Sequence, residues 1–331
     1  MRITLVATAV VVLACQALTG AWGVTGHRVI ARVAVASLPD EVPPFLRQQI
    51  DWIGVRSITP DSYRAASEPF IKLAEDPSHE WHLEAVRFLT SVPRSRTEFV
   101  QAVYDEYRRV QATDPTRART VNLTGTGVLP YTTAEVYERL KVTFRLWREQ
   151  RAANEDTRFT ELDAAFYTGW LSHYVADAAM PLHTSIHHDG WVGDNPRNFT
   201  RDGALHWGFE NNFVNLIDLR DADIASRVPA ATRLADPFSA ILQHLERAHT
   251  RLQTVYDLEQ QQAFGNRNHA AARELVYTCT SQAATTLRDL IYTAWVTSAQ
   301  PAAPRTGIVL PTDPAHPQFN PAAGSAPAPM P

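Results

Sequence analysis

Apolar residues between Trp22 and Ser298 recur at intervals of three and four positions, in segments long enough for several helical turns. This spacing places them on one face of a helix, and the alternating pattern of a half-buried strand is scarce. The pattern therefore predicts an all-α, single-domain helical bundle. Helices are expected, to within several residues at each end, at 26–37, 42–53, 97–112, 133–153, 160–180, 203–218, 237–262 and 267–297.

Two of these helices carry an apolar stripe that includes a histidine and a carboxylate. At steps of four, three and four residues, one face of the helix at 160–180 presents Phe166, Trp170, His173 and Asp177. The same steps on the helix at 203–218 give His206, Glu210, Phe213 and Ile217. Because residues at these steps share a face, both pairs of polar side chains point toward the core.

Buried imidazoles and carboxylates are costly unless each has a partner. One interpretation is an internal hydrogen bond within each pair. Two such pairs, together with His183 just after Met180-Pro181, favour a metal ion held by imidazole nitrogens and carboxylate oxygens. The chain has two cysteines, Cys15 and Cys279, which are not spaced as a thiolate metal site.

The two ends differ from the central region. Residues 1–21 contain one basic residue, Arg2, then an uncharged apolar run and small residues up to Ala21, as in a secretory signal peptide. Lipid attachment at Cys15 and an uncleaved anchor are the alternatives. Residues 299–331 are rich in proline and small residues and are expected to be an extended, disordered tail. Residues 22–298 form the expected folded domain, secreted or periplasmic.

Composition and net charge limit the classes of function that the sequence allows. The chain has 331 residues, 45% of them hydrophobic, which suits an ordinary buried core. Removing residues 1–21 would leave 35 acidic and 31 − 1 = 30 basic residues, a formal charge of −5. Such a chain has no basic field to attract nucleic acid or anionic lipid. It would keep Cys279 alone, so no intrachain disulfide is expected and stability must come from the core and from metal.

Further motifs point to a family. The segment after Ala21 reads WGVTGHRVIA, and it is followed in order by SITPDSYR, EDPSHEWHLE and HYVADAAMPLH. With the pair in GALHWGFENNF, the chain resembles the three-zinc phosphoesterases, which include secreted single-strand-specific nucleases (3′-nucleotidases) and bacterial zinc-dependent phospholipases C. The resemblance covers nearly all of residues 22–298. It implies the fold of those enzymes, with a trinuclear zinc site.

The resemblance implies a ligand set for three Zn²⁺ per chain. The first zinc would take the α-amino nitrogen and carbonyl oxygen of Trp22, with His27. The ligands implied for the second are Asp61, His79, His173 and Asp177. In the family, the aspartate at the Asp177 position bridges these two metals, which can hold a hydroxide nucleophile between them. The ligands implied for the third are His183, His206 and Glu210.

Three of these implied assignments have competitors. The family pattern makes His79 the ligand rather than His82, and favours Asp61 over Asp76 and Glu75. Arg64 matches an arginine that meets the substrate phosphate, and its alternative is a surface arginine. His187 and His188 are expected in a solvated loop.

The motifs define the substrate less well than the chemistry. Related nucleases carry a base-stacking aromatic residue and an aspartate where this chain has Glu80 and His82, although Trp81 or Trp191 could offer a stacking face. Glu210 resembles the phospholipase pattern. The interval from His183 to His206, 206 − 183 = 23 residues, is that of the nucleases.

The preferred prediction is a secreted nuclease or 3′-nucleotidase that acts on single-stranded DNA, RNA or nucleotides. A phospholipase C acting on phosphatidylcholine-type lipids is the alternative, and a metal-stabilised binding module is a third interpretation. No protein partner is implied, and a monomer is expected.

Overall fold

The computed structural model describes residues 22–66 and 68–301, and most of them are helical. No strand occurs in these ranges, where Trp81 and Gly127 form an isolated β-bridge. The prediction of a single all-α domain is therefore confirmed. The α-helices are α1 (Gly23–Ala36), α2 (Phe45–Gln48), α3 (Ile50–Arg56), α4 (Thr59–Ala65), α5 (Pro69–Glu75), α6 (Arg96–Gln111), α7 (Pro115–Ala118), α8 (Leu123–Thr126), α9 (Leu129–Ala152), α10 (Arg158–Asp177), α11 (Ala204–Trp207), α12 (Val214–Leu216), α13 (Asp221–Ile224), α14 (Pro237–His249), α15 (Leu252–Gln260) and α16 (Ala270–Ser298).

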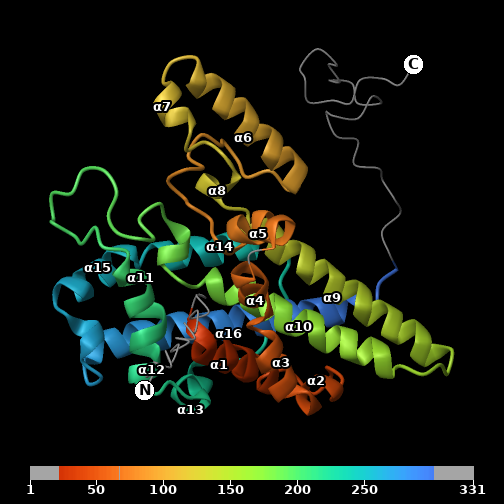
Figure 1. Ribbon diagram of the computed structural model, residues 1–331. Coiled ribbons are helices and arrows are strands. Elements are labelled where there is room, and N and C mark those ends of the chain that lie inside the picture. The colour runs from red at the N-terminus through yellow and green to blue at the C-terminus, as the bar shows by residue number, and fades with distance from the viewer. Residues whose placement is uncertain (1–21, 67, 302–331) are drawn as a thin grey trace, which may run out of the picture.

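Three long helices, α9, α10 and α16, pack against one another in the centre of the molecule (Figure 1). Helix α1 packs across this layer, in contact with α3, α10 and α16. Helices α6, α7 and α8 project together from one end of the molecule in Figure 1. Because α10 contacts α1, α3, α9 and α16, side chains near its C-terminal end are enclosed from several directions.

The predicted helices differ from the observed ones at specific places. The helix expected at 42–53 is divided at Gln49 into α2 and α3, and the one expected at 237–262 is divided at 250–251 into α14 and α15. Helices α4 and α5 were not predicted, because each is short and carries a proline in its first turn. Proline there is compatible with a helix start but resembles a break in a sequence pattern.

Two predictions concern segments outside the described residues. The signal peptide at 1–21 lies outside them, and so does the C-terminal tail beyond residue 301. Within 22–66 and 68–301, no helix combines the length and the apolar character needed to span a bilayer.

Helices α3 and α10 approach each other closely, and this contact positions His173. At Gly169 of α10, a Cβ atom would lie 2.9 Å from the carbonyl oxygen of Ile53 and 2.5 Å from Cβ of Arg56. A side chain at this position would therefore force the helices apart. The close approach places the carbonyl oxygen of Ser57, just after α3, 2.8 Å from Nδ1 of His173, one turn beyond Gly169.

His244 in α14 makes stability sensitive to acid. Its Nε2 donates to the carbonyl oxygen of Val175 at 3.1 Å, its Nδ1 accepts from the Thr286 hydroxyl at 3.2 Å, and burial lowers its pKa to about 3. Below the unfolded pKa of about 6.5, only the unfolded chain gains this proton, so the free energy of unfolding falls by about 1.4 kcal/mol per pH unit until about pH 3.

We therefore expect the free energy of unfolding of the wild type to fall more steeply between pH 6.5 and pH 4 than that of His244→Asn. Denaturant titrations at several pH values measure both slopes, and metal loss affects both proteins equally. Equal slopes would contradict a neutral, buried His244.

Candidate metal centre

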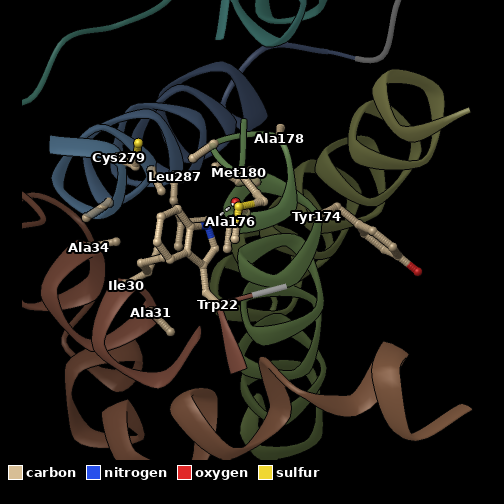
Figure 2. Packing of buried hydrophobic residues seen from close by; sticks show 14 of the residues in the cluster. Trp22, Ile30, Ala31, Ala34, Tyr174, Ala176, Ala178, Met180, Cys279 and Leu287 are labelled. Atoms are coloured by element: carbon tan, nitrogen blue, oxygen red, sulfur yellow. Dashed lines mark hydrogen bonds between the residues drawn. The ribbon is translucent and has the colours of Figure 1, made fainter. Parts of the chain in front are cut away.

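Trp22 fixes the start of α1 against α10. Its indole is fully buried, and the indole N–H donates to the carbonyl oxygen of Ala176 at 2.9 Å (Figure 2). Gly26 permits this packing, because a Cβ there would lie 2.6 Å from Cβ of Trp22. The Trp22 carbonyl oxygen accepts from the Gly26 N–H at 2.9 Å and keeps a second lone pair. Trp22 thus lies beside the residue that precedes Asp177, and His27 follows one turn into α1.

Asp177 lies among three histidines, with one on the side of Oδ1 and two on the side of Oδ2. Its Oδ1 is 3.5 Å from Nε2 of His27, whereas its Oδ2 is 2.9 Å from Nδ1 of His79 and 3.3 Å from Nε2 of His173. The four side chains come from α1, a 3-10 turn at Asp76–His79 and α10, and all are fully buried. Each carboxylate oxygen of Asp177 therefore faces a different side of the cluster.

Asp61, in the first turns of α4, also places its two carboxylate oxygens near different histidines. Its Oδ1 is 3.7 Å from Nε2 of His173 and 3.8 Å from Nδ1 of His79, and its Oδ2 is 4.0 Å from Nε2 of His27. Ligand atoms around one tetrahedral zinc stand roughly 3.3–3.6 Å apart. Separations of this size suit atoms that share an ion better than atoms that bond directly to one another.

A third group lies where a 3-10 turn, Leu182–Thr184, meets α11 and the π-helical turn Gly208–Phe213. Nε2 of His206 is 3.1 Å from Nε2 of His183 and 3.1 Å from Oε2 of Glu210, and His183 Nε2 is 3.7 Å from the same oxygen. The π turn was not predicted. Such turns occur often at functional sites, and this one carries Glu210.

The orientation of the imidazoles is set by bonds on their far sides. Nδ1 of His173, His183 and His206 lies 2.8, 2.7 and 2.8 Å from oxygens of Ser57, His79 and Asp189 respectively. Donation of Nδ1–H to these oxygens leaves the Nε2 lone pair directed into the cluster, as in metal-binding histidines. His79 has the opposite orientation: its Nδ1 faces Asp177, and its Nε2 lies 3.5 Å from Glu75.

Buried polar atoms without hydrogen-bond partners also indicate that these residues fit divalent ions. Within the described part of the chain, buried side-chain atoms that lack a hydrogen-bond partner include both ring nitrogens of His27, Oδ1 of Asp61, Nε2 of His79, Oδ1 of Asp177 and Oε2 of Glu210. Orphaned buried polar atoms are rare in proteins. Their concentration in one place, on nitrogen and carboxylate oxygen, matches the donor set of zinc.

The electrostatics also favour bound cations. Burial raises the pKa of Asp61 to about 6, against the attraction of His173. Burial opposes protonation of His79, but the carboxylates of Asp177 and Glu75 raise its pKa to about 9. Burial likewise opposes protonation of His206, but Glu210 and Asp189 raise its pKa to about 10. The carboxylates therefore require positive charge beside them, which metal ions supply by displacing these protons.

Arg64 lies at the edge of the core cluster, which is formed by His27, Asp61, His79, His173 and Asp177. Its Nε is 3.3 Å from Oδ1 of Asp76, and a terminal nitrogen is 3.9 Å from Oε1 of Glu80. The guanidinium side chain is about a quarter exposed. Burial would lower its pKa, but Glu80 and Asp61 raise it, so the group is a permanent cation that can meet an anionic substrate.

The structure brings together all eight expected metal-binding side chains, in three groups, and the side chain of Trp22 packs beside them. His79 lies in the core cluster, whereas His82 lies in a separate group with Glu80 and His188. Two expectations were wrong. His187, expected in a solvated loop, is buried and stacks on Trp191, with ring centroids 3.9 Å apart. His188, expected in the same loop, stacks on His82 and is only partly solvated, with 27% of its side chain exposed. Trp81 is buried and offers no stacking face.

Two partners of the metal-site histidines, Asp189 and Glu75, were not assigned this role from the sequence. Asp189 orients His206, and Glu75 lies behind His79 and accepts from the Tyr174 hydroxyl at 2.8 Å. Glu75 precedes His79 by one helical turn, which was an available signal. Asp189 lies 17 residues before His206, so only the fold shows its role.

Comparison with models of known protein families and with curated proteins gives no match. Among solved structures, the chain is similar to the crystal structure of Clostridium perfringens alpha-toxin isolated from an avian strain, with a TM-score of 0.42 and 16% sequence identity. The similarity covers 87% of this chain and 66% of the toxin chain, so this chain spans about two thirds of the toxin's length. The chemistry of the site therefore has to be inferred from its residues.

Proposed function

We propose that the chain is a zinc-dependent phosphoesterase that hydrolyses phosphodiester bonds in single-stranded nucleic acids and 3′-phosphomonoesters of nucleotides. The observation that carries this proposal is the position of Asp177, with one oxygen facing His27 and the other facing His79 and His173. A carboxylate in this position can serve two cations at once. The proposal includes three zinc ions, a secreted or periplasmic monomer, and the ligand set implied by the family resemblance.

Different residues of the chain would bind the metal ions and the substrate phosphate. Zinc, when bound, lowers the pKa of a coordinated water and so supplies a nucleophile at neutral pH. Asp61 and Asp177 would hold two of the cations, and the group of His183, His206 and Glu210 would hold a third. Arg64 is placed to bind substrate phosphate through two N–H donors. Orientation of the phosphate against fixed charges is the main contribution a protein makes to this kind of reaction.

Support for a nucleotide substrate comes from the family spacing between His183 and His206. The usual base-binding side chains are replaced by Glu80 and His82, and Trp81 is buried against Phe99 and Tyr131. Base recognition would therefore differ from that of related nucleases. A preference for unpaired strands is still expected, since a base in a duplex cannot enter a pocket beside the metals.

One observation favours the phospholipid alternative. Helix α5 has no buried residue, and its Phe70 and Leu73 are 90% and 76% exposed. Apolar side chains presented in this way can enter a lipid surface. Because α5 leads directly into Asp76–His79, which carries a core histidine, a lipid bound at α5 would have its headgroup near the site.

A side-by-side assay distinguishes the two substrates. Zinc-saturated protein is tested on single-stranded DNA, RNA, a 3′-mononucleotide and phosphatidylcholine vesicles. Hydrolysis of the nucleotide substrates supports the proposal. Hydrolysis of phosphatidylcholine alone, reduced in Phe70→Ser, would reverse the ranking, and no hydrolysis of any phosphoester would leave a metal-stabilised binding module.

Replacement of Arg64 tests its role directly. Arg64→Ala is expected to reduce kcat/KM by roughly 10²-fold, the effect of losing one strong donor to a developing charge. Arg64→Lys should recover only part of this loss, because it lacks the bidentate geometry. Metal content should be unchanged in both variants. Activity equal to wild type in Arg64→Ala would contradict the assignment.

The first residue of the processed chain is the subject of a further prediction. The family resemblance implies that the free α-amino group of Trp22 is a zinc ligand, and the ring nitrogens of His27 have no hydrogen-bond partner among the described residues. An amine with a pKa near 8 can lose its proton to zinc at neutral pH, whereas a peptide nitrogen cannot bind in this way.

A chain that begins at Trp22 should therefore bind one more zinc than a chain that begins at Ala21, and hydrolyse substrate faster. Elemental analysis and initial rates measure both. Equal zinc content and equal rates would show that the main chain of Trp22 is not a ligand, and would favour lipid attachment at Cys15.

A further inference from the structure

We infer that Glu80, His82 and His188 form a fourth metal-binding site, separate from the three groups already described. One ligand atom from each of the three side chains lies within 4.8 Å of the other two. Two imidazoles and one carboxylate are a donor set for zinc and similar divalent ions, with coordination positions left for water or a ligand. This inference does not depend on the proposed hydrolytic function.

The backbone holds two of the ligands on one side of an extended segment. The N–H groups of Trp81, His82 and Leu83 donate to the carbonyl oxygens of His183, Thr126 and Thr184 at 2.9, 2.9 and 3.0 Å. In an extended segment, alternate side chains share a face. Glu80 and His82 therefore point the same way, while Trp81 points into the core against Phe99 and Tyr131.

Gly127 permits this backbone contact. It has a φ of +74°, and a Cβ there would lie 1.8 Å from the carbonyl oxygen of Glu80. The segment is therefore fixed on both sides, and the positions of Glu80 and His82 are set before any ion binds.

The two histidines are oriented like His173 and His183. Nδ1 of His82 lies 2.9 Å from the carbonyl oxygen of Gly125, and Nδ1 of His188 lies 3.2 Å from that of Ser185. Donation of Nδ1–H to these oxygens leaves both Nε2 lone pairs available, as for His173 and His183. The rings of His82 and His188 stack at 4.9 Å and 13°, which resembles the stacking of His27 on His173 at 4.3 Å and 13°.

One buried atom of the group, Nε2 of His82, lacks a hydrogen-bond partner among the described residues. His82 is 2% exposed, and its Nε2 has no hydrogen-bond partner although Oε2 of Glu80 lies 2.9 Å away. In the third group, too, Nε2 of His206 and Oε2 of Glu210 lie 3.1 Å apart although that oxygen has no hydrogen-bond partner. The competing interpretation is a plain ion pair between Glu80 and a protonated His82, which would need neither His188 nor a metal.

The position of the group connects it to substrate binding. Glu80 lies 3.9 Å from Arg64, and His188 Nε2 is 3.6 Å from Asp189, the carboxylate that orients His206. An ion held here would place a second positive charge next to Arg64. Glu80 and His82 stand at the sequence positions where the family resemblance implies base-binding residues, so an ion held here would contribute to the choice of substrate.

Zinc counting on folded variants tests the inference. At saturating zinc, His188→Ala and the isosteric Glu80→Gln are each expected to bind one zinc per chain fewer than the wild type. The control is His249→Ala, since His249 has nearly the same side-chain exposure as His188, 26% against 27%, and also faces a carboxylate, Glu84 at 3.6 Å. It should bind as much zinc as the wild type.

A double variant excludes an indirect effect through His206. His206→Ala alone should lose the ion of its own group, and His188→Ala combined with His206→Ala should lose one ion more. Because only differences between variants are used, the result does not depend on how many ions the other groups hold or on any activity. Equal zinc in the wild type, His188→Ala and Glu80→Gln, or equal zinc in the single and double variants, would overturn the site and leave the ion pair.

Discussion

Asp177→Asn is expected to lose more than one zinc ion per chain and to reduce phosphoester hydrolysis to background. The carboxylate faces His27 with one oxygen and His79 and His173 with the other, so the two cations of the proposed site would both depend on its charge. The amide keeps the shape but removes the negative charge and one acceptor. A ligand that serves a single ion should cost only that ion. Elemental analysis and initial rates measure the two effects.

The matched control is Asp163→Asn, an exposed aspartate on the same helix, α10. It should retain full zinc content and activity. Circular dichroism shows whether each variant is folded. Retention of all zinc by a folded Asp177→Asn would show that Asp177 does not bridge two ions.

Removal of zinc is expected to lower the melting temperature by more than about 10 °C. An ion present at a thousand times its dissociation constant stabilises the folded state by about 4 kcal/mol, and a domain of this size shifts by about 2 °C per kcal/mol. With the three proposed sites in the core, and with Cys279 a free thiol in the described part of the chain, the effect should be large. Without ions, Asp61, Asp177 and Glu210 also leave buried oxygens without partners.

Differential scanning calorimetry before and after chelation, followed by re-addition of zinc, measures this effect. Re-addition should restore the original melting temperature. An unchanged melting curve after verified removal of the metal would show that the buried groups are satisfied without ions.

Much of the fold could be predicted because the long helices have regular apolar faces. The patterns for α6, α9, α10 and α16 were all found close to their observed bounds. The short helices α4 and α5 could not be predicted in this way, because each has seven residues and a proline in its first turn, and so shows no long periodic face.

The candidate site was more predictable than the fold details. Pairs such as His173 with Asp177 are visible in the sequence because a helix brings residues four apart to one face. His188 was misplaced because its partner His82 is distant in sequence, and only the backbone contacts of residues 81–83 with 126, 183 and 184 bring the two together. Periodicity along one helix gives no information about such contacts.

The most direct test of the metal centre is anomalous diffraction at the zinc absorption edge from crystals of the zinc-saturated protein. The expected result is one peak between His27 and Asp61, a second between His79 and His173 with Asp177 bound to both ions, and a third among His183, His206 and Glu210. Well-ordered side chains with no anomalous peak in any of these three groups would contradict a zinc enzyme.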